Sequence, residues 1–184
     1  MDKLVKRNTD CKNLLIYRKA DIIFLMTNVF VERFVSKFSR TRDQMIQAAR
    51  SGKQNIVEGM NDLETSKDTG INLINVAKGS LLELLEDYED YLKTNNGEKW
   101  EKDDEKTLAM RRFAINHEAA EDFLKLMETR DGIVCANIMI VLIKQLDYLF
   151  YKFLQSLSEK FLEEGGFKEK MHRMRIDRRN GRRF

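Results

Sequence analysis

Histidine, the most versatile side chain for acid–base and metal chemistry, occurs only twice in this 184-residue sequence, at His117 and His172. A di-iron helical bundle needs two Glu-x-x-His motifs and two further inward-facing carboxylates. One such motif occurs, Glu169-x-x-His172, and it lies in a strongly basic stretch. The two cysteines, Cys11 and Cys135, stand in no metal-binding spacing, so we expect buried or incidental thiols in a reducing compartment. We therefore expect no metal site and no cofactor.

Nucleophilic and phosphate-cradling motifs are also missing from the sequence. Gly79-Ser80 is no nucleophile elbow, because no strand pattern precedes it and no histidine stands nearby. No glycine-rich phosphate loop occurs. These features favour a protein without catalytic residues.

The last 17 residues, 168–184, are strongly basic, and we call them the basic segment. Eight basic and two acidic residues give it a net charge of +6, whereas the remainder of the chain has −3. Arginine binds phosphates through two parallel hydrogen bonds and stacks on bases, so this composition predicts contact with RNA or DNA. The expected nucleic-acid-binding residues are Lys168, Lys170, Arg173, Arg175, Arg178, Arg179, Arg182 and Arg183.

Two other interpretations of the basic segment remain open. It could be a charged, mobile terminus without a ligand. It could also dock electrostatically on an acidic protein, including the acidic stretch Glu83–Asp90 of a neighbouring subunit.

Four polar residues stand beside apolar helical stripes: Asn55, Glu58, Ser80 and Glu83. We expect them to form a structural polar network between helices that fixes their register, because a buried polar group left unpaired costs about 1–3 kcal/mol. The alternative is a network between subunits.

The sequence pattern that must position these side chains is helical along most of the chain. Apolar stripes predict long helices over residues 14–38, 42–60, 70–94 and 133–162, and one or two short helices over 101–130. No strand-like alternation occurs, and proline is absent. The prediction is an all-α fold: an antiparallel four-helix bundle over residues 1–167, with a helical insertion at about 95–130 between the third and fourth long helices.

Small residues on one face of the second helix predict close packing. Ala48, Ala49, Gly52 and Gly59 recur at helical spacing there. Glycine inside a helix costs about 1 kcal/mol relative to alanine, so close approach of another backbone is the expected reason for Gly52. Asn95-Asn96-Gly97 is expected to end the third helix.

The apolar runs are short for a membrane span. Ile22 to Val31 and Ile133 to Ile143 contain too few residues to cross a bilayer, and no small-residue cleavage site follows the first. We expect a cytoplasmic protein without a membrane segment.

Two motifs resemble the signature of the four helix bundle proteins, relatives of proteins encoded in intervening sequences of bacterial large-subunit ribosomal RNA genes. The run Ala77-Lys78-Gly79-Ser80-Leu81-Leu82-Glu83-Leu84 is similar to the family's Ala-x-Gly-Ser-x-x-Glu-Leu. Within Gln44–Gly59 the matching elements are Gln44, Ala48-Ala49, Ser51, Asn55-Ile56 and Glu58-Gly59. Leu142-Ile143-Lys144-Gln145 and the Phe161-to-Arg175 run, which contains Glu164-Gly165-Gly166, are similar to the subgroup with a C-terminal suffix domain.

This resemblance implies a four-helix bundle that assembles into homo-oligomeric rings, commonly pentamers. It also implies a relationship to the accessory proteins of diversity-generating retroelements, which bind nucleic acid and a reverse transcriptase. RNA, DNA and a protein partner are therefore the expected ligands.

A second, shorter resemblance involves His117. Arg112 precedes it by five positions and Arg111 by six, which resembles the Arg-x(4–6)-His motif of HEPN-type ribonucleases. That resemblance implies His117 as a general acid or base and an arginine that stabilises a phosphorane-like transition state. The competing interpretation is a surface pair between His117 and Glu121, one helical turn apart.

Overall fold

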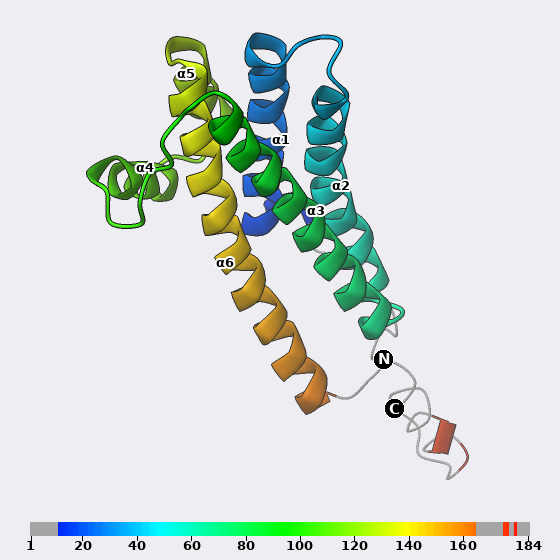
Figure 1. Cartoon of the computed structure of the whole chain (residues 1–184). Coiled ribbons are helices and arrows are strands. Elements are labelled where there is room, and N and C mark those ends of the chain that lie inside the picture. Colours follow the sequence, from blue (N-terminus) through cyan, green and yellow to red (C-terminus); the bar gives the residue numbers. More distant parts are fainter. Residues whose placement is uncertain (1–10, 165–174, 177–178, 180–184) are drawn as a thin grey trace.

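The computed structural model describes residues 11–164, 175–176 and 179. Within these residues the protein is all-α, with one 3-10 turn, six α-helices and no strand (Figure 1). After the 3-10 turn Cys11–Asn13, the helices are α1 (Leu15–Phe34), α2 (Arg40–Asp62), α3 (Lys67–Thr94), α4 (Glu105–Asn116), α5 (Ala120–Thr129) and α6 (Gly132–Glu164). The predicted all-α class is confirmed, as are the four long helices. Two short helices, α4 and α5, lie between the third and fourth, where one or two were expected.

The first long helix is shorter than the sequence suggests. α1 ends at Phe34, because Val35 takes an extended conformation. Phe38, expected on the buried stripe of a helix over 14–38, is therefore fully exposed. Ser39 caps α2, its hydroxyl oxygen accepting a hydrogen bond from the Thr41 amide at 3.3 Å.

α2 and α3 approach each other closely along their small-residue faces. A Cβ atom placed on Gly52 would lie 2.6 Å from Leu81 Cγ. One placed on Gly59 would lie 2.9 Å from the Gly70 carbonyl oxygen. The predicted close packing of the Gly52 face is confirmed, since contacts this short leave no room for a side chain.

The end of α3 follows its sequence. Asn96 takes a left-handed conformation with φ 53°, and the Gly97 amide donates to the Leu92 carbonyl at 2.8 Å. Beyond this cap, the buried Asn137 of α6 forms hydrogen bonds with the connection between α3 and α4. Its side-chain oxygen accepts from the Trp100 amide at 2.7 Å, and its amide group donates to the Glu98 carbonyl at 2.9 Å.

Two cations of α1 hold the short helices in place. The Lys19 ammonium donates to the carbonyls of Ala114 and His117 at the C-terminal end of α4. Arg33 donates to the Met127 carbonyl near the end of α5. The last carbonyls of a helix have no partner inside it and form the negative end of its dipole. The two cations therefore stabilise the C-terminal ends of α4 and α5.

The core lies where α1, α2, α3 and α6 meet. α2 packs on α3, α3 on α6, and α1 on both α2 and α6, while α4 and α5 lie on α6 and α1 respectively. A buried hydrogen bond crosses this core: the Tyr88 hydroxyl donates to Thr27 Oγ1 at 3.0 Å. The Tyr88 ring meets Phe30 edge-on, with 4.8 Å between the ring centroids.

α6 is, among the residues described, the one helix whose length and composition would suffice to cross a membrane. The qualifying stretch is longer than Ile133 to Ile143, because it continues past Lys144 and Asp147. However, 61% of its most apolar part is buried in the protein. Packing against α1 and α3 therefore accounts for the composition of this helix.

Candidate functional site

A polar groove runs between α2 and α3, and we call it the α2–α3 groove. It encloses about 750 Å³. Its lining comes from α2 and α3, and comprises Arg40, Asp43, Gln44, Gln47, Ala48, Ser51, Ser80, Glu83, Glu86, Asp87 and Asp90.

Two of the four residues expected in the polar network are joined in the structure. The Ser80 hydroxyl donates to Ser51 Oγ at 3.1 Å, which links α3 to α2. The Asn55 amide donates to the same Ser51 Oγ at 3.0 Å. Ser51 is thus the centre of the network, a role that its place in the signature did not reveal.

The other two residues of the expected network are not bonded to it. Glu58 and Glu83 are exposed and make no hydrogen bond or ion pair with another described residue. Their carboxylates are hydrated, which removes the need for a partner inside the protein. The hydrogen-bonded network in the structure is therefore Asn55–Ser51–Ser80, without the two glutamates.

Acidic side chains dominate the α3 wall of the groove. Burial raises the pKa of Asp87 to about 6, and the neighbouring charges of Asp90, Glu83 and Glu86 act in the same direction. A surface of this sign repels phosphates, so the groove is suited to a cation and not to a nucleic-acid backbone.

His117 lies at the C-terminal end of α4 and is engaged locally. Its ring stacks on Phe113, with 3.9 Å between the centroids, and its Nδ1 donates to the Phe113 carbonyl at 2.9 Å. Arg112 is exposed and forms no hydrogen bond with His117. His117 itself has an extended backbone just beyond the last residue of α4, Asn116.

The basic segment lies mostly outside the described residues. Arg175 and Arg179 are described, and both are exposed. The other six expected nucleic-acid-binding residues lie outside the described part, as does Glu169-x-x-His172.

No group of three His, Cys, Asp or Glu side chains within the described residues could hold a metal ion. Cys11 and Cys135 are free thiols. Cys135 is buried, and burial raises its pKa to about 11, so it stays protonated near neutral pH.

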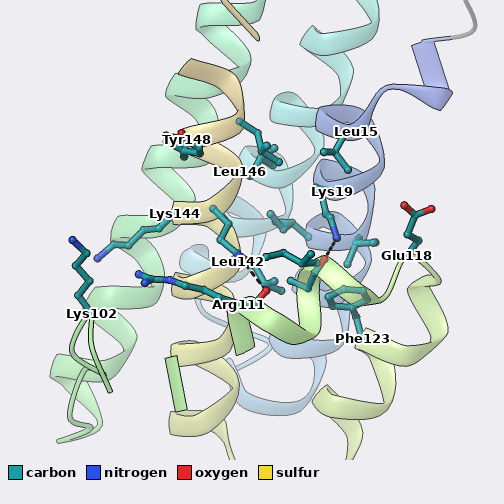
Figure 2. Close-up of a pocket in the computed structure, with 16 residues that line it drawn as sticks. Leu15, Lys19, Lys102, Arg111, Glu118, Phe123, Leu142, Lys144, Leu146 and Tyr148 are labelled. Atoms are coloured by element: carbon teal, nitrogen blue, oxygen red, sulfur yellow. Dashed lines mark hydrogen bonds between the residues drawn. The ribbon is translucent and has the colours of Figure 1, made fainter. Parts of the chain in front are cut away.

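A second cavity, which the sequence did not indicate, opens between α1, α4 and α6 (Figure 2). Its volume is about 700 Å³. Apolar side chains from α1 and α6 form its walls, and α4 closes one side with Ala114 and Ile115. Lys19, Lys102, Arg111 and Lys144 also line it, against the single acid Glu118. We call this the α1–α4–α6 cavity.

The cavity could not be found from the sequence because its walls come from helices far apart in the chain. Its α4 side depends on where the insertion docks. The hydrogen bonds of Lys19 hold the insertion there, together with a bond of 3.3 Å from the Gln145 side chain to the Arg111 carbonyl. The structure leaves three apolar lining residues exposed, namely Leu15, Ile115 and Tyr148.

Comparison of the chain with models of known protein families, with curated proteins and with solved structures finds no match.

Proposed function

We propose that this protein is a non-enzymatic scaffold that assembles into a homo-oligomeric ring and contacts RNA or DNA through the basic segment. The observation that carries the proposal is the segregation of charge. The basic segment has a net charge of +6 and the rest of the chain −3. Since the acidic residues of α3 gather along the α2–α3 groove, nucleic acid would be repelled there and attracted to the basic segment.

The scaffold in this proposal is an antiparallel four-helix bundle of α1, α2, α3 and α6, with α4 and α5 as an insertion. Each of the four long helices packs on two of the others in the order expected for a bundle. Short connections at residues 35–39 and 63–66 support antiparallel neighbours. The resemblance to the four helix bundle proteins favours a pentamer.

Exposed aromatic residues on α6 support the oligomer. Tyr148 and Tyr151, three positions apart, are 58% and 55% exposed. Aromatic side chains are enriched at the centres of protein interfaces. In a ring, several copies of the basic segment would act together, so that weak phosphate contacts combine into stronger binding.

A second candidate function is a protein-interaction oligomer without nucleic acid. The same exposed tyrosines favour it, and so does the acidic α2–α3 groove, on which the basic segment of a neighbouring subunit would dock. In both functions the protein is cytoplasmic and spans no membrane.

Catalysis by Arg112 and His117 is the least favoured alternative. The Nδ1 atom of His117 already donates to the Phe113 carbonyl, and Arg112 makes no hydrogen bond with the imidazole ring. We expect the purified protein to leave RNA intact. The ribonuclease would be established instead if the protein cleaved RNA, and if His117→Ala abolished that cleavage while Glu121→Ala did not.

Native mass spectrometry of the full-length protein, before and after nuclease treatment, tests the assembly. We expect a multiple of the 21.7 kDa chain mass, with bound nucleic acid that nuclease removes. A multiple of that mass without nucleic acid would favour the second candidate. A monomer would exclude the ring.

A further inference from the structure

The α1–α4–α6 cavity has the size and lining of a small-molecule site, a role that goes beyond the proposed function. Ligand cavities in proteins enclose about 300–1,000 Å³, are mostly apolar and contain a few placed polar groups. This cavity encloses about 700 Å³. Ile22, Leu142, Leu146 and Phe123 are among its apolar walls.

Three exposed apolar side chains converge on the same cavity. Ile115 is 74% exposed, Tyr148 58% and Leu15 42%, and all three are lining residues. They come from α4, α6 and α1, so the apolar surface surrounds the opening and is not a stripe along one helix. Covering such a surface with an apolar group is favourable, because it removes apolar area from water.

The charged lining is unbalanced. Glu118, the one acid, forms an ion pair with Arg18. The Lys19 ammonium donates to carbonyls at the end of α4. Glu118 is therefore not available to neutralise the remaining cations, Lys102, Arg111 and Lys144.

Those three cations have too little negative charge beside them. Arg111 and Lys102 form no ion pair with another described residue. Lys144 shares the carboxylate of Glu89 with Lys99, at 3.6 Å and 2.6 Å respectively. In Figure 2 the charged ends of Lys102, Lys144 and Arg111 point to the same side of the cavity, opposite Glu118.

The surroundings of Lys144 disfavour its charged form. Burial lowers its pKa, and the positive charge of Lys99 lowers it further. The loop acids nearest in sequence to Lys102, namely Glu101 and Asp103, are not among the lining residues.

We propose that the α1–α4–α6 cavity binds a small amphipathic anion, a carboxylate on an unbranched apolar chain. The chain lies against the walls of α1 and α6. The carboxylate accepts hydrogen bonds from the Arg111 guanidinium, the group best suited to bind a carboxylate through two parallel bonds. Lys102 and Lys144 add positive charge at the same side.

Isothermal titration calorimetry of the full-length protein tests this with three probes: decanoate, the uncharged 1-decanol of equal chain length, and acetate. Decanoate is expected to bind once per chain and at least about tenfold more tightly than either other probe, since both the chain and the charge contribute. Equal affinity for decanoate and 1-decanol, or no saturable binding of decanoate, would overturn the proposal.

The sequence offers a matched pair of variants. Arg111→Gln removes the guanidinium that lines the cavity, and Arg112→Gln removes its exposed neighbour on the same helix. We expect Arg111→Gln to weaken decanoate binding about tenfold and Arg112→Gln to change it less than about twofold. Equal weakening by the two variants would show general surface attraction and overturn the assignment.

Ile115→Glu, an exposed wall position, should weaken binding while circular dichroism shows an unchanged fold.

Discussion

Gly52 of α2 and Leu81 of α3 are in direct contact, since a Cβ atom on Gly52 would lie only 2.6 Å from Leu81 Cγ. Leu81 is 2% exposed and cannot move aside without displacing the core. At this level the close approach of the two helices therefore depends on the absence of a side chain at position 52.

Replacing Gly52 with alanine should destabilise the protein. Overpacking of a full core costs about 1–3 kcal/mol, which exceeds the gain of about 1 kcal/mol in helix propensity. Thermal unfolding followed by circular dichroism measures the effect. The matched control is Gly79→Ala, where no atom lies within 4 Å of the added Cβ, and this substitution should stabilise the protein by about 0.5–1 kcal/mol. Equal effects of the two substitutions would contradict the close contact.

Asn137 should be the main anchor of the α3–α4 connection. Replacing it with alanine leaves the Trp100 amide and the Glu98 carbonyl without their partner, at a cost of about 1–3 kcal/mol. Amide hydrogen exchange should then increase at Trp100, while Asn28→Ala, which removes a bond within α1 only, should leave that exchange unchanged. Unchanged exchange in Asn137→Ala would show that other interactions hold the connection.

The acidic wall of the α2–α3 groove predicts a pH dependence. The pKa of Asp87 is raised from 3.8 to about 6 in the folded state, so the folded protein keeps a proton that the unfolded chain releases between these values. The stability contributed by this proton is present below about pH 4 and is lost as the pH rises through about 6. Glu83, Glu86 and Asp90 on α3 add to the effect, and Arg40 and Asp43 face them from α2.

Asp87→Asn should therefore raise the melting temperature at pH 7.5 by about 2–4 °C, the change expected for roughly 1 kcal/mol in a chain of this size. At pH 4 the same substitution should have little effect. Asp103→Asn, an exposed loop substitution, should show no such difference between the two pH values. A stabilisation by Asp87→Asn that is equal at pH 4 and pH 7.5 would argue against the crowding of charge.

Local patterns predicted the helices well, because each depends on residues close in sequence. The small-residue face of Gly52 and the Asn96-Gly97 stop both correspond to contacts in the structure. The predicted end of α1 was wrong by about a turn. The apolar residues after Phe34 continue the helical pattern, but the backbone is extended at Val35.

The candidate site was less accessible to sequence reasoning. Ser51 joins Asn55 to Ser80 only because α2 and α3 meet at that level. The α1–α4–α6 cavity depends on where the insertion docks, which Lys19 decides through carbonyls 95 and 98 positions away. Interactions at such separations leave no periodic signal in the sequence.

The most direct test of the central claim is a binding titration of full-length protein against RNA and DNA at several salt concentrations. Arg175, Arg178, Arg179 and Arg182 are replaced with glutamine in one variant. A control variant replaces the exposed Lys93, Lys106, Lys125 and Lys152 with glutamine, which changes the net charge equally. We predict salt-dependent binding by the unaltered protein and the control. In the arginine variant the slope of log affinity against log salt should fall by about 0.7–0.9 for each phosphate that the variant no longer binds. Absence of salt-dependent binding to any RNA or DNA, or equal weakening in both variants, would contradict the account.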